Sequence, residues 1–203
     1  MHITNWRQFL KDGLPSDDKP ASITIGVFDG VHLGHQALIK RIVSYNADAG
    51  YVPVIFTFRQ NHKTRNKVQS TENKEPRDIQ SFEERLALFE KLGVQITVVI
   101  DFSEEFMRLP GSEFLQILSE HCNIGFFAVG SGFRCGCQLD TDAAAIAGYF
   151  ASQNIPVEIV PLVCDGQLPV SSSRIRAAIA EGDILKAQAM LGKMNTVTGT
   201  DFS

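Results

Sequence analysis

The stretch "GVFDGVHLGH", Gly26 to His35, decides the fold, because it joins a strand pattern to a helix pattern through three glycines. The apolar run 21–28 predicts a buried strand, and residues 33–50 carry apolar side chains on one helical face. Asp29-Gly30 between them is a turn pair, so we expect the helix to begin near His32 to Gly34. Free backbone N–H groups and the positive end of the helix dipole make such a junction an anion site.

The two histidines, His32 and His35, stand three positions apart and therefore project from one side of a helical turn. Imidazoles there can ligate a metal, donate hydrogen bonds to phosphate oxygens, or be polar residues at an exposed helix start. A metal would need a third ligand of defined spacing nearby, and the sequence offers none, so we expect no metal ligands. Gly34 has no side chain, which would let a phosphate approach the backbone. The stretch by itself leaves phosphate binding and the exposed helix start open.

Apolar runs alternate with helical patterns along most of the chain. The further strands are predicted at 51–58, 95–100, 125–130 and 155–163, and further helices at 81–93 and 142–153. The segment 102–121 predicts a short helix, a turn at Pro110-Gly111 and a longer helix, and 171–192 predicts two helical pieces broken at Gly182 and Asp183. Such alternation predicts an α/β fold, a parallel sheet of about five strands with helices on both faces. Ligands bind there at the carboxyl ends of strands. No repeat or linker divides the chain, so we expect a single domain over 1–203, with its core at 19–192 and a C-terminal tail at 193–203.

Composition excludes some partners. The formal net charge of −4 argues against general binding to nucleic acid or to an anionic membrane, because both attract basic surfaces. Residues 1–13 lack a secretion signal pattern and no run of about 18 apolar residues occurs, so we expect a cytoplasmic protein. Cys135 and Cys137 form a C-x-C pair with no second pair, so we expect no zinc site. No feature of the sequence predicts an oligomeric state.

Two further segments suggest contact with a ligand. "VGSGFRCG", 129–136, follows a strand, and its Arg134 could meet a phosphate or only solvent. "VSSSRIR", 170–176, precedes an amphipathic helix, so at least one of Ser171 to Ser173 should be its N-cap. The remaining hydroxyls, with Arg174 or Arg176, could hold a polyphosphate.

"GVFDGVHLGH" and "SSSRIR", about 140 residues apart, together resemble the HxGH nucleotidylyltransferase superfamily, whose HUP-type fold is Rossmann-like. "SFEERLALFEKLGV", "AVGSGFRCG" and "VSSSRIRAAIAEGDILKAQAMLGK" extend the resemblance to the adenylyltransferase module of bacterial bifunctional riboflavin kinase/FAD synthetases, over about 22–198. The resemblance implies an FMN adenylyltransferase (FAD synthetase), which transfers AMP from ATP to FMN and releases pyrophosphate, with Mg²⁺ accompanying ATP.

The resemblance also implies roles for individual residues. It gives His32, His35 and Arg176 catalytic contacts with the ATP phosphates. The implied nucleotide-binding residues are Gly26, Phe28, Asp29, Gly34, Gly130, Ser172 and Ser173. Asn61, His62 and Phe133 are expected on the flavin side. There the chain departs from the family, because Gln60, Asn61 and His62 replace a Pro-His-Pro element and Gly132 replaces an acidic residue.

The chain also departs from the bifunctional members near its end. Those members continue through "LGRPY" into a kinase module, whereas this chain has "LGKMN" at 191–195 and ends at Ser203. We therefore expect no riboflavin kinase activity and a separate riboflavin kinase as the source of FMN. Two other hypotheses are an adenylyltransferase with a different phosphorylated acceptor and a catalytically weak nucleotide- or flavin-binding protein.

Overall fold

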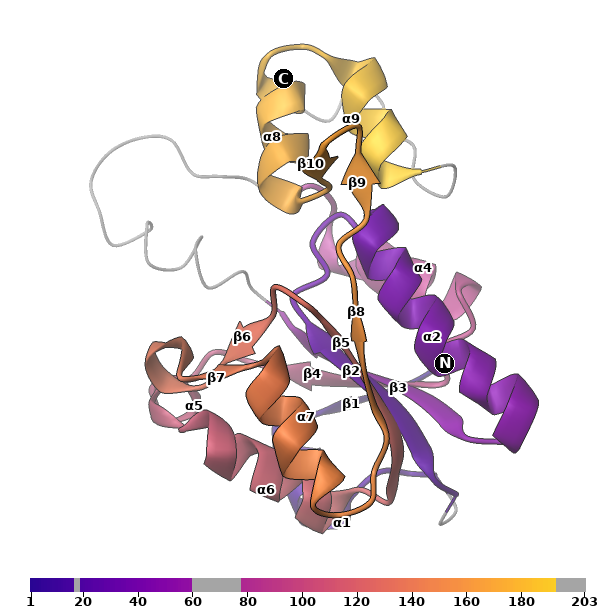
Figure 1. Ribbon diagram of the computed structural model, residues 1–203, viewed down its shortest axis with the longest axis vertical. Coiled ribbons are helices and arrows are strands. Elements are labelled where there is room, and N and C mark those ends of the chain that lie inside the picture. Colours follow the sequence, from indigo (N-terminus) through magenta and orange to yellow (C-terminus); the bar gives the residue numbers. More distant parts are fainter. Residues whose placement is uncertain (17–18, 60–77, 193–203) are drawn as a thin grey trace.

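The protein is built on a six-stranded parallel sheet (Figure 1). The computed structural model describes residues 1–16, 19–59 and 78–192. The strand order is β1-β4-β3-β2-β5-β8, and every neighbouring pair is parallel. The strands are β1 (His2–Asn5), β2 (Ala21–Gly26), β3 (Val52–Phe58), β4 (Ile96–Ile100), β5 (Ile124–Gly130) and β8 (Val157–Val160). The α/β prediction is therefore confirmed.

Within the six-stranded sheet, β1 is the strand that sequence analysis did not predict. It pairs with β4 from His2 to Asn5 and forms an edge of the sheet. Because an edge strand has a neighbour on one side only, its side chains need not form the continuous apolar run that marks a central strand. Three of its four residues are exposed, which explains the missing signal.

Helices cover both faces of the sheet, as predicted. Their bounds are α1 (Trp6–Asp12), α2 (Leu33–Ala49), α4 (Phe82–Lys91), α5 (Glu104–Arg108), α6 (Gly111–His121), α7 (Ala143–Ala151), α8 (Ser172–Ala180) and α9 (Ile184–Leu191). α2 and α4 lie on one face, and α1, α6 and α7 lie on the other (Figure 1). Ser81 and Glu84 form a capping box at the start of α4, so the predicted helix start is confirmed.

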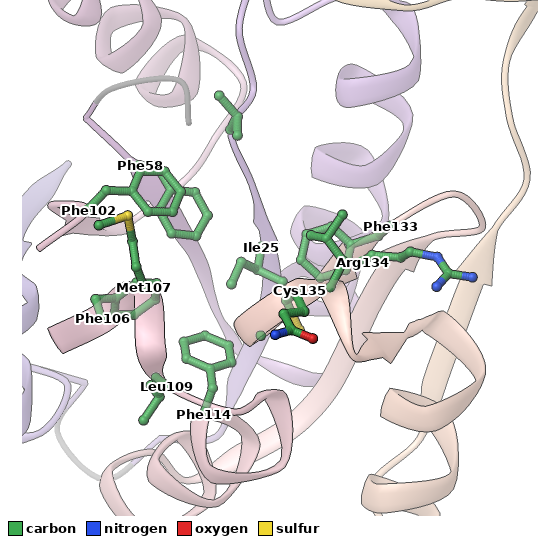
Figure 2. Close-up of a pocket in the computed structure, with 14 residues that line it drawn as sticks. Ile25, Phe58, Phe102, Phe106, Met107, Leu109, Phe114, Phe133, Arg134 and Cys135 are labelled. Carbon is green, nitrogen blue, oxygen red and sulfur yellow. The ribbon is translucent and has the colours of Figure 1, made fainter. Parts of the chain in front are cut away.

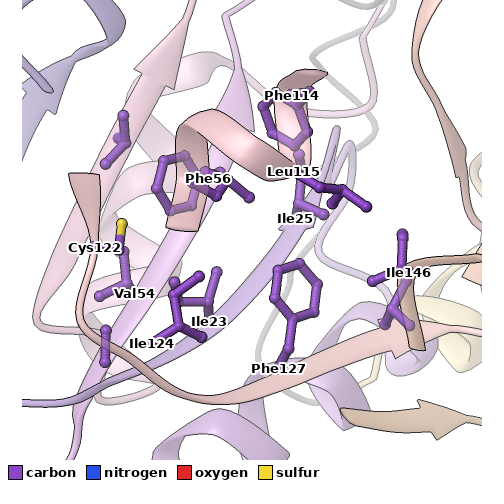
Figure 3. Close-up of a cluster of buried hydrophobic side chains, with 14 of the residues drawn as sticks. Ile23, Ile25, Val54, Phe56, Phe114, Leu115, Cys122, Ile124, Phe127 and Ile146 are labelled. Carbon is purple, nitrogen blue, oxygen red and sulfur yellow. The ribbon is translucent and has the colours of Figure 1, made fainter. Parts of the chain in front are cut away.

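The alternation of side chains along the strands separates two apolar clusters. Ile23 and Ile25 of β2 point to the cluster under α1, α6 and α7 (Figure 3). Ser22 of β2 is fully buried under α2, on the opposite face of the sheet. Its Oγ donates a hydrogen bond to the Ile42 carbonyl of α2 at 2.7 Å. A buried hydroxyl is tolerated because it is bonded in this way. Each large side chain buried here stabilises the fold by about 1.5–3 kcal/mol.

The last part of the described chain forms a small unit beyond the sheet (Figure 1). α8 and α9 share their own apolar cluster, and a hairpin of β9 (Cys164–Asp165) and β10 (Leu168–Pro169) precedes them. A second short hairpin, β6 (Arg134–Cys135) with β7 (Thr141–Asp142), encloses the 3₁₀ turn Cys137–Leu139. The first hairpin confirms the turn that Asp165-Gly166 predicts.

The strand order reverses beside β2. The chain runs from β2 through β3 to β4 on one side, and β5 and β8 lie on the other, so the order reverses between β2 and β5. Open parallel sheets bind ligands at such a reversal, outside the carboxyl ends of the strands. Gly26 and Gly130 end these two strands. Among the described residues, no helix is both long and apolar enough to cross a membrane.

Candidate active site

The turn after β2 is built on unusual backbone conformations. β2 ends at Gly26, two residues earlier than the apolar pattern predicts, because Phe28 has a φ of 56°. Its ring is fully buried against Phe89 and the edge of His35. A Cβ on Gly26 would lie 3.2 Å from the Phe28 ring, so the glycine leaves room for it. A large side chain at positive φ costs about 1–3 kcal/mol and is found mainly at functional sites.

The two histidines face each other at the start of α2. Their rings stack with centroids 3.6 Å apart and planes 17° apart. The His35 backbone N–H donates to His32 Nδ1 at 3.4 Å, which leaves the proton of a neutral His32 ring on Nε2. A Cβ on Gly34 would lie 3.2 Å from His32 Cε1. Gly34 therefore makes room for the imidazole, a reason that the sequence did not reveal.

Burial keeps both imidazoles neutral. It lowers the pKa of His32 to about 4 and lowers the pKa of His35 well below its usual range, with His32 and Arg85 adding to the second effect. At neutral pH the pair therefore offers hydrogen-bond donors rather than positive charges. A bound phosphate anion would stabilise the protonated forms and raise both pKa values.

We expect His32 to make folding sensitive to acid. The pKa of His32 is about 4 in the folded protein against 6.5 ordinarily, so acid favours the unfolded chain, which binds the proton more tightly. The stability is fully present above pH 6.5 and falls by about 3 kcal/mol toward pH 4, at roughly 1.4 kcal/mol per pKa unit. Urea unfolding from pH 7.5 to 4.5 measures this loss, which should shrink in His32→Gln. Equal losses in both proteins would contradict the prediction.

Asp29 connects the glycine-rich turn to the C-terminal unit. Its carboxylate is buried, and Oδ1 accepts a hydrogen bond from the Ile79 backbone N–H at 2.9 Å. Oδ2 forms an ion pair with Arg176 Nη1. Ser172 Oγ donates to the Asp29 carbonyl oxygen at 2.9 Å. Burial raises the pKa of Asp29, while the Ile79 N–H and Arg176 oppose that shift. The two motifs that are far apart in sequence are therefore in direct contact.

The start of α8 separates the roles of its polar residues. Ser171 is the N-cap, accepting a hydrogen bond from the Arg174 N–H. Arg174 donates to the carbonyl oxygens of Leu168 and Pro169 and pairs with Asp165, so its guanidinium is engaged in stabilising the β9–β10 hairpin. Ser173 is exposed at the first turn of the helix. Arg176, by contrast, pairs with Asp29 beside the glycine-rich turn.

Gln36 is a supporting residue that sequence analysis missed. Its buried Nε2 donates to the carbonyl oxygens of Val31 at 2.9 Å and Leu191 at 2.8 Å. This side chain thereby joins the turn before α2 to the end of α9. A glutamine on an otherwise apolar helix face was the signal available.

The backbone at Gly130 is open to approach. This residue ends β5, and a Cβ built on it would meet only Leu38, at 3.7 Å. A ligand can therefore approach the backbone between β5 and α2, as the adenine or ribose of the predicted nucleotide would. Ser131 and Gly132, which follow, are exposed.

An apolar cavity of about 420 Å³ lies on the other side of β2 (Figure 2). Its lining includes Ile25, Val27, Phe58, Phe102, Phe106 and Phe133. Phe58 and Phe102 stack with ring centroids 4.4 Å apart. Phe133, which is expected on the flavin side, lines this cavity, whereas the other two residues expected there, Asn61 and His62, lie outside the described residues. For the other lining residues, the sequence feature that could have indicated a pocket is the pair of phenylalanines in "FSEEF", Phe102 and Phe106.

The described residues offer no protein cage for a divalent cation. Within them, no group of three or more His, Cys, Asp or Glu side chains is placed to hold a metal. The buried carboxylate at the site, Asp29, already accepts from a backbone N–H and pairs with Arg176. Mg²⁺ is commonly held mainly by substrate phosphates and water.

A parallel sheet that reverses beside two stacked histidines, with two helix N-termini at that edge, defines a Rossmann-like nucleotidylyltransferase fold. The family model described as FAD synthetase matches residues 14–174, and the chain belongs to this family.

Individual relatives agree with this assignment. The chain is 33% identical over 172 residues to a putative bifunctional riboflavin kinase/FMN adenylyltransferase of Geobacillus thermodenitrificans, covering 84% of this chain and 88% of the relative. It is 25% identical over 178 residues to the bifunctional riboflavin kinase/FMN adenylyltransferase of Escherichia coli K12, covering 87% of this chain and 56% of that protein. A Buchnera aphidicola relative of the same name is 26% identical and is covered to 57%. The chain thus spans little more than half the length of these two proteins.

A solved structure shares the fold. It is the crystal structure named a macrolide-efflux protein from Streptococcus pneumoniae, with a TM-score of 0.78 and 27% identity. The similarity covers 95% of this chain and 60% of that one.

Proposed function

We propose that this protein is an FMN adenylyltransferase, which converts ATP and FMN to FAD and pyrophosphate. One observation carries the proposal: the glycine-rich turn with the two histidines directly follows the strand β2, which lines the aromatic cavity. Ile25 and Val27 line the cavity, and the turn from Phe28 to His35 follows at once. A flat ring system held among the phenylalanines would direct its phosphate toward the histidines. Membership in the FAD synthetase family supports this choice of acceptor.

The reaction requires positioning rather than a protein nucleophile. A phosphate oxygen of FMN attacks the α-phosphorus of ATP, a new P–O bond forms, and the bond to the pyrophosphate oxygen breaks with its electron pair on that oxygen. His32 would donate from Nε2 to an oxygen on which negative charge develops. The N-terminus of α8, with Ser172 and Ser173, would hold the leaving pyrophosphate beside Arg176.

Arg176 would have to share its charge between Asp29 and the nucleotide. Its guanidinium is about one-fifth exposed, while the Asp29 carboxylate is buried. The guanidinium has five N–H donors, so pairing through Nη1 leaves others for phosphate oxygens. Asp29 would thereby orient Arg176 for the phosphates.

Turnover measured by chromatography of the products tests the proposal. We expect FAD and pyrophosphate to appear in equal amounts from FMN and Mg·ATP, and nothing from riboflavin, because riboflavin lacks the attacking phosphate. Phe133→Ala should raise KM for FMN up to about 10-fold and leave KM for ATP near its original value, since a lost aromatic contact costs up to about 1.5 kcal/mol. Cys137→Ala, in the 3₁₀ turn of the same hairpin and outside the cavity lining, controls for damage to that segment.

Two results would reject the proposal. ATP consumption with another phosphorylated acceptor, but not with FMN, would point to a different adenylyltransferase. Binding of ATP and FMN without any product would point to a binding protein.

A further inference from the structure

Arg85 occupies an unusual place between the two halves of the site. It lies on α4 in phase with Phe82 and Phe89, and its side chain is fully buried. Its Nη1 donates to the carbonyl oxygens of Val27 at 2.8 Å and Phe58 at 2.9 Å. The last residues paired between β2 and β3 are Gly26 and Thr57. The two carbonyls follow directly after this pair, where the strands separate. The guanidinium closes that gap.

The remaining edge of this guanidinium is unsatisfied. Nε and Nη2, the pair that usually grips a carboxylate, are buried and have no hydrogen-bond partner in the described part of the chain. The carboxylate of Asp78 is 4.0 Å from Nη2, beyond hydrogen-bond distance. An unsatisfied buried donor costs about 1–3 kcal/mol, more if charged, so its retention in a folded protein points to a function.

The charge of Arg85 acts on the reaction site. Val27 and Phe58, to which it is bonded, both line the aromatic cavity. On the other side its charge reaches His35 and Asp29, as the pKa shifts of both groups record. Arg85 therefore lies at the junction that the acceptor phosphate must reach. In a low-dielectric interior, a positive charge that is only partly neutralised acts strongly on phosphates nearby.

We propose that Arg85 is a positioning residue for adenylyl transfer, which holds the ends of β2 and β3 in place and supplies a buried positive charge beneath the phosphate junction. This inference rests on the proposed function. Arg85 needs no direct contact with substrate, because it acts through the Val27 carbonyl and through the electrostatic field at His35.

The test compares Arg85→Gln, which removes the charge, with Arg85→Lys, which keeps it. For Arg85→Gln we expect kcat to fall about 30- to 100-fold with KM for ATP changed less than about 3-fold, since displaced reacting atoms cost about 100-fold. Arg85→Lys should recover most of kcat. The acid limb of the pH profile of kcat should move to higher pH in Arg85→Gln and not in Arg85→Lys. Without the Arg85 cation the pKa of His35 rises, and the repulsion from His32, when His32 is protonated, remains.

The matched control is Phe150→Leu, which removes packing from α7 on the opposite face, where Phe150 stacks on Phe127. It should lower the unfolding midpoint without moving kcat or the acid limb. An Arg85→Gln protein that behaves like this control would overturn the proposal. If Arg85→Gln does not fold, a loss in Arg85→Lys above 100-fold would overturn it as well.

A readout without turnover separates this proposal from the proposed function. NMR titration of the imidazole nitrogens should show the pKa of His35 higher in Arg85→Gln than in the original protein, and near the original in Arg85→Lys. If the original protein makes no FAD, the proposed function fails. The His35 pKa in the variants still decides whether the positive charge of Arg85 acts on the histidine pair. An unchanged His35 pKa in Arg85→Gln would overturn the electrostatic part.

Discussion

We expect His32→Ala to lower kcat for the proposed FAD formation about 100- to 1000-fold, the usual loss when one donor to a developing negative charge is removed. The reason is the geometry of the imidazole pair. His32 Nδ1 accepts from the His35 N–H, so the neutral ring donates from Nε2, and stacking on His35 holds the ring in place. Because the donor acts mainly in the transition state, kcat should fall more than the affinity for ATP. Steady-state kinetics with ATP and FMN measure both.

The matched control is His2→Ala, an exposed histidine on the edge strand β1. It should retain the original kcat and KM for both substrates. His32→Asn is a second useful variant, because its amide restores a donor and should recover part of kcat. An unchanged kcat in His32→Ala would remove His32 from the mechanism. A raised KM for ATP with full kcat would reduce its role to substrate binding.

We expect Asp29→Asn to break the ion pair between the glycine-rich turn and Arg176 of the C-terminal unit, and to lower both stability and turnover. Removing one partner of a buried ion pair costs about 3–5 kcal/mol; the lower end applies because Arg176 keeps some solvent exposure. The Ile79 N–H can still bond to the asparagine oxygen, so the protein should fold. We expect kcat to fall at least 10-fold, because Arg176 loses the partner that orients it. Urea unfolding and steady-state kinetics measure the two effects.

A double-mutant cycle tests whether the pair is the cause. Asp29→Asn with Arg176→Gln should cost less stability than the sum of the single variants, with a coupling of about 1–3 kcal/mol. Asp165→Asn is the matched control, because it breaks the ion pair of Arg174 in the same unit. That pair is partly exposed, so its loss should cost no more than about 1 kcal/mol and leave kcat unchanged. Additive effects of the two site variants would contradict the assignment.

The contact between the two motifs shows how far local patterns reach. Glycines, a turn pair and an N-cap are local features, and they placed His32 and Ser172 at helix starts. That both helices meet at one edge follows from parallel topology, in which the carboxyl ends of strands share an edge. The pairing of Arg176 with Asp29, rather than with solvent, depends on packing between segments 147 residues apart.

Other elements gave no clear local signal. β1 is four residues long, largely exposed and at the edge of the sheet, so its side chains carry little pattern. Arg85 lies on a helix that the capping box predicted, yet its charge marks it as a surface residue until the strand ends that it bridges are known. The cavity is assembled from several elements, and no single stretch describes its shape.

The sequence by itself determined the α/β class, the junction at Gly26 to His35 and the family resemblance, because hydrophobic periodicity and turn chemistry are properties of neighbouring residues. Tertiary structure decided the chemistry of the site. It buried the imidazoles and lowered their pKa values. It paired Arg176 with Asp29 and Arg174 with the hairpin residue Asp165. It also placed the buried guanidinium of Arg85 between the glycine-rich turn and the aromatic cavity. Burial and long-range pairing set these properties, and both depend on residues far apart in the chain that only folding brings together.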